Sequence, residues 1–93
     1  MTIIGDDCFI GPGVMTTNDK WMGTGDAEFR RKNRKGPIIM DGAVIGAAAI
    51  LLPGVVIGKD VIIGAGSIVT KNITVPGVYV GRGTTLQRIR AVI

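Results

Sequence analysis

Branched aliphatic residues recur at every sixth position along most of the chain. In steps of six they are Ile39, Ile45, Leu51, Ile57, Ile63, Val69 and Val75, and Ile4 and Ile10 keep the same spacing upstream. Four residues after each of them stands a small or aliphatic side chain, such as Ala43, Ala49 or Val55. Neither a helix nor a simple alternating strand produces a period of six. Stacked repeat units do, because one such unit cannot bury its apolar face alone.

Residues that tolerate a positive φ stand three positions after the repeating aliphatics. They are Asp7, Gly13, Gly42, Gly54, Asp60, Gly66 and Asn72, and Ala48 is the one exception. Glycine, asparagine and aspartate adopt the left-handed conformation at low cost. Each unit is therefore expected to be a short strand followed by a tight turn, and burial of each branched aliphatic would contribute about 1.5–3 kcal/mol. The sequence predicts an all-β solenoid.

One segment breaks the period, because the step from Ile10 to Ile39 is not a multiple of six. The chain must leave the solenoid there, and we expect a protruding loop over about residues 18–36. The spacing ends after Val75, so residues 81–93 are expected to form a short cap, for which a helix over residues 86–93 is one candidate. A chain of 93 residues predicts a single domain over residues 1–93.

The sequence contains no histidine and a single cysteine. These counts exclude a histidine general base, a serine–histidine triad and a conventional zinc site within one chain, so no metal is expected. Cys8 falls at a small core position of the repeat, and a reactive thiol is the alternative. No apolar run approaches the roughly 18 residues of a membrane span, and no secretory signal opens the chain. We expect a cytoplasmic protein that does not enter a membrane.

The segments IIGDDCFIGPGV, AVIGAAAILLPGVVIGKDVIIGAGSIVTKN and VPGVYVG resemble the hexapeptide-repeat acyltransferases. The resemblance implies a left-handed parallel β-helix that is triangular in section, with three repeat units per coil. On that fold the chain makes about three coils, over residues 2–17, 39–56 and 57–74. The resemblance also implies a homotrimer that binds acetyl-CoA, as acyl donor, in a groove between neighbouring helices, with a loop from one coil closing over it. Because the chain opens inside a repeat unit, it resembles the C-terminal portion of such a protein. Its open N-terminal end is expected to expose strand edges through which further copies could pair.

A narrower resemblance concerns Thr17-Asn18-Asp19, which follows a unit beginning Ile10-Gly11-Pro12. The N-acetyltransferases that act on nucleotide-linked amino sugars carry a similar Thr-Asn-Asp motif. An amine needs less help than a hydroxyl to attack a thioester, so an amide and a carboxylate could suffice without imidazole. We expect Asn18 to bind the amine or the thioester and Asp19 to accept the proton. The alternative is an Asx turn that starts the loop.

The rest of the insert supplies candidate substrate-binding residues. They are Thr17, Trp21, Glu28 and Arg30, with Glu28 and Asp26 also reserve carboxylates for the chemistry. Asp26 and Glu28 could equally be plain solvated charges. Trp21 and Phe29 could stack on a base or anchor the loop.

Five cations lie between Arg30 and Lys35. They could form a solvated face, or contact the phosphates of CoA or of a nucleotide-sugar. Non-specific attraction of nucleic acid is a third possibility. No aromatic-studded surface accompanies the cations, so the expected partner is a small sugar acceptor rather than a nucleic acid.

The resemblance also implies the residues that line the CoA path. Ala65-Gly66-Ser67 and Val69-Thr70-Lys71 match family segments whose backbone amides meet the pantetheine, and Lys71 would approach a phosphate. The oxyanion would bind a backbone N–H of Gly46 or Ala47. A third family segment, Gly-x-Pro-Ala followed by a cation, is altered here to Gly81–Thr85, where Arg82 or Arg88 would substitute.

Together these residues predict an acetyl-CoA-dependent acyltransferase that N-acetylates an amino group on a nucleotide-linked or related sugar. The alternative is a truncated, catalytically silent β-helix that acts as an assembly module. The early start of the repeat, the missing histidine and the altered Gly81–Thr85 segment favour that alternative.

Overall fold

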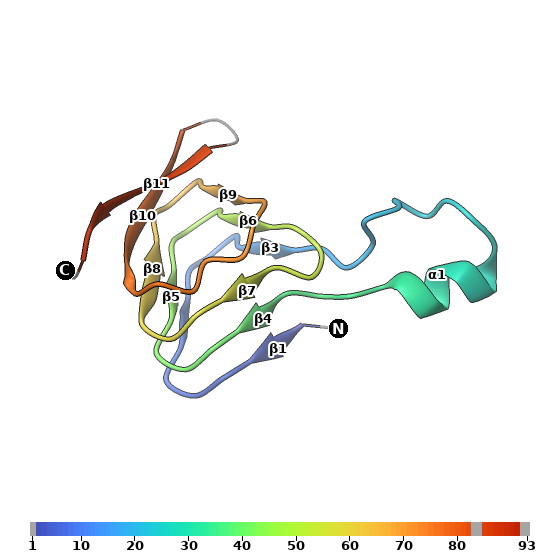
Figure 1. Cartoon of the computed structure of the whole chain (residues 1–93), viewed down its shortest axis with the longest axis horizontal. Helices are drawn as coiled ribbons and strands as arrows, with labels where there is room; N and C mark the ends of the chain where they lie inside the picture. The colour runs from blue at the N-terminus through green and yellow to red at the C-terminus, as the bar shows by residue number, and fades with distance from the viewer. Residues whose placement is uncertain (1, 83–84, 92–93) are drawn as a thin grey trace.

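Short strands wind into a solenoid in the computed structural model, which describes residues 2–82 and 85–91 (Figure 1). The first coil holds β1 (Ile3–Ile4), β2 (Phe9–Ile10) and β3 (Met15–Thr16). The second holds β4 (Ile38–Ile39), β5 (Val44–Ile45) and β6 (Ile50–Leu51), and the third holds β7 (Val56–Ile57), β8 (Val61–Ile63) and β9 (Ile68–Val69). The all-β solenoid predicted from the period of six is therefore confirmed.

Corresponding strands of successive coils pair in parallel and form three sheets, one for each side of the solenoid. Their orders begin β1-β4-β7, β2-β5-β8 and β3-β6-β9. Ile38 pairs with Val56 and Val44 with Ile62, so a full coil advances by eighteen residues. One coil therefore contains three repeat units, as expected.

The repeating aliphatics of the second and third coils form the core. Ile39, Ile45, Leu51, Ile57, Ile63 and Val69 are all buried, and the small residues Ala43, Ala49 and Ser67 fill the space between them. The predicted turn positions Asp7, Gly13, Gly42, Ala48, Gly54, Asp60 and Gly66 all have positive φ. The aliphatic side chains of the six-residue pattern thus point into the core, as predicted. The backbone turns at the positions where residues that tolerate a positive φ stand.

The first coil has no neighbour on its outer side among the described strands. β1, β2 and β3 each lie at an edge of their sheet. Ile4 and Ile10, which occupy core positions of the repeat, are 52% and 37% exposed. This end of the solenoid therefore presents apolar side chains and strand edges to solvent.

The third coil is two residues shorter than the second. Ile57 forms its bridge with Ile73, not with Val75. Ile73 is accordingly buried, whereas Val75 is 58% exposed. The predicted core position at Val75 is thus wrong. Asn72 lacks the positive φ of the other turn positions, and its side-chain Oδ1 accepts a hydrogen bond from the Val56 N–H at 2.8 Å.

A β-hairpin follows the third coil. β10 (Gly77–Arg82) extends the second sheet by pairing in parallel with β8. β11 (Thr85–Arg90) pairs antiparallel with β10. The helical cap considered for residues 86–93 is therefore wrong over residues 86–90, and residues 92–93 lie outside the described part. Pairing with β11 satisfies the free edge of β10, whose Val78, Tyr79 and Val80 are good strand residues.

α1 (Ala27–Asn33) is the one helix among the described residues, and it lies in the insert. Within residues 2–82 and 85–91 no helix has the length and apolar character to cross a membrane.

Candidate functional site

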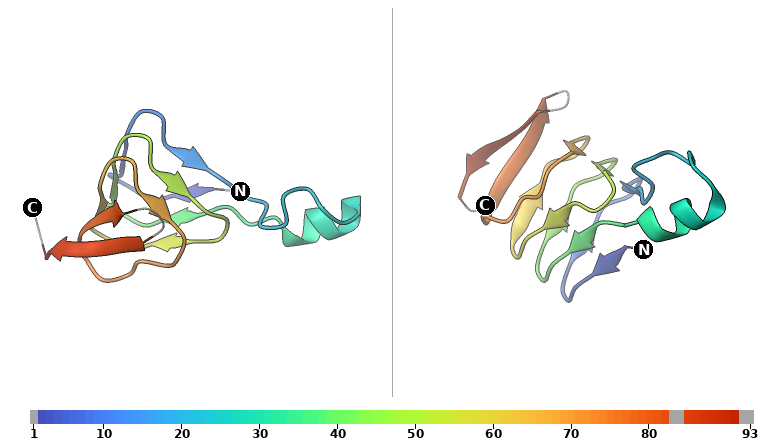
Figure 2. Two further views of the ribbon diagram at one scale, coloured as in Figure 1. Left: turned by 90° about the horizontal axis from the view of Figure 1, so that it is seen from above. Right: turned by 45° about the vertical axis from the view of Figure 1, so that its right-hand side comes forward.

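The insert leaves the solenoid after β3 and returns at β4, and it projects from one corner (Figures 1 and 2). The Lys35 N–H donates to the Asn18 carbonyl at 2.7 Å and closes its base. Beside that contact, the Thr17 hydroxyl donates to the Leu51 carbonyl at 2.9 Å. Gly36 and Pro37, where the chain re-enters the solenoid, are buried. The two ends of the insert therefore meet at its base, where Thr17 is hydrogen-bonded to the second coil.

The carboxylate of Asp19 organises the first turn of the insert. It accepts hydrogen bonds from the backbone N–H groups of Trp21 at 2.9 Å and Gly23 at 2.7 Å. Met22 and Gly23 have positive φ, so the chain reverses sharply around this carboxylate. The Asx-turn alternative for Asp19 is what the structure shows, although each carboxylate oxygen keeps capacity for a further proton donor.

The side chain of Asn18, unlike that of Asp19, takes no part in the hydrogen bonds of the insert. The backbone carbonyl of Asn18 is engaged by Lys35, but its side chain is exposed and makes no hydrogen bond to any other described residue. The amide of Asn18 is thus available to a ligand at the base of the insert.

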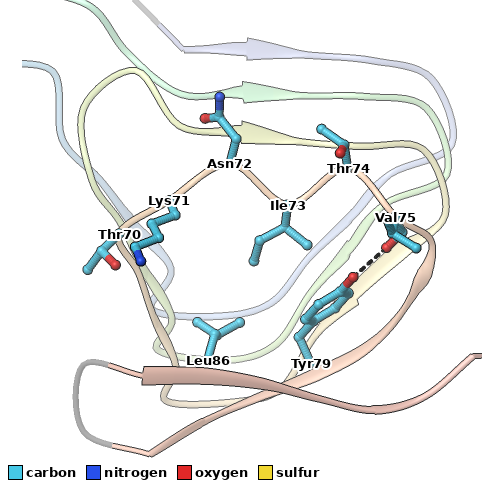
Figure 3. A pocket seen from close by; sticks show the side chains of 8 residues that line it. All are labelled: Thr70, Lys71, Asn72, Ile73, Thr74, Val75, Tyr79 and Leu86. Atoms are coloured by element: carbon cyan, nitrogen blue, oxygen red, sulfur yellow. Dashed lines mark hydrogen bonds between the residues drawn. The ribbon is translucent and has the colours of Figure 1, made fainter.

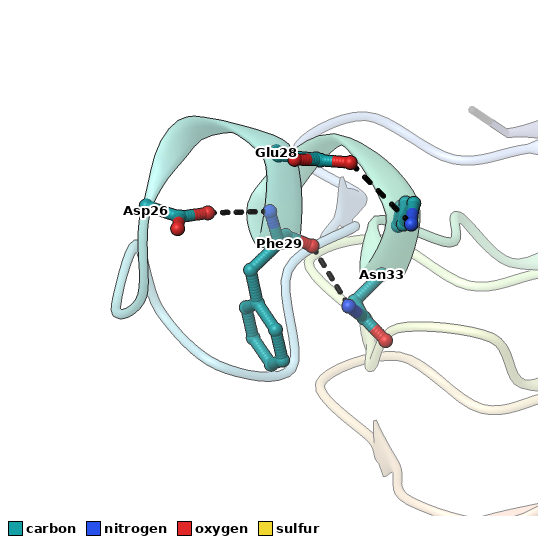
Figure 4. Close-up of polar contacts among 5 residues, drawn as sticks. Asp26, Glu28, Phe29 and Asn33 are labelled. Atoms are coloured by element: carbon teal, nitrogen blue, oxygen red, sulfur yellow. Dashed lines mark hydrogen bonds and ion pairs between the residues drawn. The ribbon is translucent and has the colours of Figure 1, made fainter.

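Asp26 and Glu28 both support α1 (Figure 4). Asp26 is the N-cap, because its Oδ1 accepts the Phe29 N–H at 2.9 Å. Glu28 Oε1 lies 3.5 Å from Lys32 Nζ in an exposed pair one turn apart, and Asn33 Nδ2 donates to the Phe29 carbonyl at 2.8 Å. These contacts agree with the alternative in which neither carboxylate takes part in the chemistry.

Arg30 and the two aromatic residues hold the insert together internally. Arg30 Nη1 donates to the Gly25 carbonyl at 2.6 Å and to the Gly23 carbonyl at 3.3 Å. The rings of Trp21 and Phe29 meet edge to face with their centroids 5.8 Å apart. The anchoring alternative for the aromatics therefore applies within the insert, and Arg30 belongs to the same internal framework. The sequence did not predict this role of Arg30, because no sequence motif indicates it.

The cofactor-binding candidates Gly46, Ala47, Ala65 and Gly66 lie at one corner, in the turns after β5 and β8. The Gly46 N–H donates to the Ile63 carbonyl and the Gly66 N–H to the Ala47 carbonyl, both at 2.8 Å. Those two amides are therefore used within the solenoid. The amides of Ala47 and Ala65 make no hydrogen bond to another described residue, so they remain the donors of this corner that a ligand could use.

Ser67 and Lys71 have different surroundings. Ser67 is buried, and its hydroxyl donates to the Gly64 carbonyl at 2.7 Å and accepts the Gly81 N–H at 3.0 Å. It joins the third coil to β10, so its side chain does not face a ligand. Lys71 is exposed in the turn after β9.

The candidates at the C-terminal hairpin are Arg82 and Arg88. Arg82 ends β10, and its side chain lies outside the described part. Arg88 donates through Nη2 to the Pro76 carbonyl at 2.8 Å. The considered substitute Arg88 is thus already engaged within the hairpin.

One chain does not bring all candidates together. Asn18 and Asp19 follow β3, on the corner that also carries Lys71. Ala47 and Ala65 follow β5 and β8, on a different corner of the solenoid. A site that uses both sets needs corners from two solenoids.

Comparison with protein families finds the same repeat. Residues 36–71 match the family described as bacterial transferase hexapeptide (six repeats), and residues 1–16 match the hexapeptide repeat of succinyl-transferase. No curated protein sequence matches the chain significantly.

Solved structures give similar results. A galactoside acetyltransferase in complex with coenzyme A is 32% identical, with a TM-score of 0.72, over 100% of this chain and 46% of its own. A maltose O-acetyltransferase from Clostridium difficile 630 is 34% identical, with a TM-score of 0.71, over 99% of this chain and 49% of its own. A mutant of AntD, an N-acyltransferase from Bacillus cereus, in complex with dTDP and coenzyme A is 25% identical, with a TM-score of 0.69, over 99% and 53%. The chain spans about half the length of these structures.

The parallel sheets, the period of six and these matches define a left-handed parallel β-helix of the transferase type. The chain belongs to the hexapeptide-repeat acyltransferase family.

Proposed function

We propose that the protein transfers an acetyl group from acetyl-CoA to an amino group on a nucleotide-linked or related sugar. The observation that carries this proposal concerns the side-chain amide of Asn18, which is exposed and makes no hydrogen bond to another described residue. Asn18 lies at the base of the insert, on the corner of the solenoid that also holds Lys71. Three similar solved structures are acyltransferases, and two of them contain coenzyme A. The amino-sugar acceptor rests on the Thr17-Asn18-Asp19 motif, and a similar N-acyltransferase was solved with dTDP.

The residues suit attack by an amine. The neutral amine nitrogen forms a bond to the thioester carbonyl carbon, and the carbon–sulfur bond then breaks to release the CoA thiolate. Asn18 would orient the amine, and the proton that the amine loses would pass to Asp19 or to the departing thiolate. The Ala47 N–H would stabilise the oxyanion formed between the two steps, because it is a fixed and unused donor.

We further propose that the site forms between subunits of a homotrimer. This assembly would place the insert corner of one solenoid beside the Ala47 and Ala65 corner of its neighbour, which one chain keeps apart. Exposed Ile4 and Ile10 support a second contact, in which two open N-terminal ends pair. A cytoplasmic location stays a prediction that rests on the single cysteine.

Thiol release from acetyl-CoA in the presence of amino-sugar nucleotides tests the activity. Asn18→Ala should lower kcat by about a hundredfold, the usual effect of removing one well-placed catalytic hydrogen bond. Asn33→Ala is the matched control, because it removes an exposed asparagine of the same insert whose side chain hydrogen-bonds only to the Phe29 carbonyl among the described residues. Equal activity of the two variants would contradict the role of Asn18.

A catalytically silent assembly module is the second candidate. It is favoured by Asp19, whose two carboxylate oxygens already hold the turn of the insert. An absence of thiol release with amine and alcohol acceptors, from a folded oligomer, would support this second function and count against the first.

A further inference from the structure

A cavity of about 380 Å³ opens between the last turn of the solenoid and the C-terminal hairpin (Figure 3). Residues 70–75 form one wall, and Tyr79 of β10 and Leu86 of β11 form the other. No pattern in the sequence predicts this cavity. It results from the shortened third coil, which turns Ile73 inward while the hairpin crosses the open end.

The cavity has an apolar body. Ile73 and Leu86 point toward each other from opposite walls, and the ring of Tyr79 stands beside them (Figure 3). Ile73 is buried, and Leu86 and Tyr79 are half-buried. The Tyr79 hydroxyl donates to the Val75 carbonyl at 2.6 Å, so its proton is already used.

One charge lies at the edge of this apolar body. Lys71 runs along the Thr70 side of the cavity, whereas the side chains of Asn72 and Thr74 point away from Leu86 (Figure 3). No aspartate or glutamate lines the cavity. Lys71 forms no ion pair with a described residue, because the ion pair of residues 2–82 and 85–91 is Lys32–Glu28. The cavity therefore combines an apolar part, formed by Ile73, Leu86 and Tyr79, with one positive charge that no described carboxylate pairs.

We propose that this cavity binds a small carboxylic acid with an apolar tail. The tail would lie between Ile73, Leu86 and Tyr79, and the carboxylate would meet the Lys71 ammonium group. The volume is in the lower part of the range of about 300–1,000 Å³ that small-molecule sites occupy, so a short chain or one ring fits it. A cation without a carboxylate beside it selects an anion over a neutral or positively charged ligand of the same shape.

This site shares Lys71 with the corner of the insert, but it lies apart from Asn18, Asp19 and Ala47, the residues of the proposed acyl-transfer chemistry. The insert with Asn18 leaves the first coil, whereas the cavity lies beyond the third coil. The Ala47 and Ala65 amides lie on another corner. The inference therefore does not depend on the proposed function.

Titration of the full chain with sodium octanoate, followed by calorimetry and by NMR of the methyl groups, tests the proposal. We expect saturable binding that shifts the methyl signals of Ile73 and Leu86. Octylammonium should bind about tenfold more weakly or not at all, because it places a positive charge beside Lys71. Equal binding of octanoate and octylammonium, or shifts confined to the exposed N-terminal end, would overturn the proposal.

Two variants separate the charge from the apolar body. Lys71→Met should weaken octanoate binding about tenfold, the scale of one charge-assisted contact, whereas Lys59→Met on another turn should leave it unchanged. Leu86→Trp should abolish binding by filling the cavity. Because that change could disturb the hairpin, the methyl shifts of the unmodified chain carry the same information. Competition between CoA and octanoate would assign the cavity to the acyl-donor path and overturn a separate site.

Discussion

The Ser67 hydroxyl accepts a hydrogen bond from the Gly81 N–H at 3.0 Å, and this contact joins the third coil to the C-terminal hairpin. Ser67 is 1% exposed and occupies a position that holds alanine, valine, cysteine or isoleucine in other repeat units. A Cβ added at Gly81 would lie 3.0 Å from Ser67 Cα, so the approach also depends on glycine. A polar core residue is tolerated here because both of its hydrogen bonds are made.

Replacing Ser67 should destabilise the protein through that contact. Ser67→Ala leaves the Gly81 N–H without its partner, which costs about 1–3 kcal/mol. Ser67→Val should lose a similar amount although it restores an aliphatic side chain of the repeat. Denaturant unfolding of both variants measures the effect, and a Ser67→Val protein as stable as the unmodified one would contradict it.

The shortened third coil makes Val75 and Ile57 behave differently although both obey the period of six. Ile57 is 0% exposed, so Ile57→Ala should cost about 2–5 kcal/mol. Val75→Ala removes an exposed side chain and should change the free energy of unfolding by about 0.5 kcal/mol or less. Urea unfolding of the two variants decides between the regular and the shortened coil, because a regular coil predicts similar losses for both.

Ala48 stands where the other turns have glycine or aspartate, and its φ is 59°. A side chain in the left-handed region costs about 1–2 kcal/mol. Ala48→Gly should therefore stabilise the protein by up to about 1 kcal/mol, after the entropy that glycine adds to the unfolded chain. Ala65→Gly is the control, because Ala65 lacks a positive φ and gains only the entropic penalty. A thermal melt in which both variants lose stability would argue against strain at Ala48.

Asp19 should matter for the order of the insert. Asp19→Ala removes the acceptor of the Trp21 and Gly23 N–H groups, so amide hydrogen exchange and proteolysis within residues 20–35 should become faster. Glu28→Ala breaks only an exposed ion pair and should leave both rates nearly unchanged. Unchanged proteolysis of Asp19→Ala would show that the carboxylate is not needed for the turn and would leave it free for proton transfer.

The solenoid could be predicted from the sequence because its rules are local. A buried aliphatic at each sixth position and a left-handed residue three places later are steric requirements of every unit, and Ile45 with Ala48 meets them as Ile63 with Gly66 does. The boundaries of the insert also follow from the lost spacing. The same rules failed at Val75, because the Asn72 side chain replaces the turn by bonding to Val56 at the start of the same coil.

The sequence predicted which residues belong to the candidate site, but not the contacts that each of them makes. The motif Thr17-Asn18-Asp19 singles out three neighbours, but their tasks differ in the fold: Thr17 bonds to Leu51, Asp19 holds the turn, and Asn18 keeps its side chain free. The repeat predicts that Ala47 and Ala65 lie at a corner of the solenoid. It does not predict that their backbone N–H groups lack a hydrogen-bond acceptor, because that depends on which carbonyl groups lie next to them in the fold.

The sequence by itself determined the coil length, the core and most of the turns, since these depend on residues within one repeat unit. The tertiary structure decided the shortened coil, the hairpin and the cavity between Lys71 and Leu86. Those features depend on contacts between repeat units that depart from the regular eighteen-residue pairing, such as Asn72 with Val56 and Ser67 with Gly81. The periodic pattern predicts how each repeat unit packs on the next, but it does not predict the structure that follows the last regular unit.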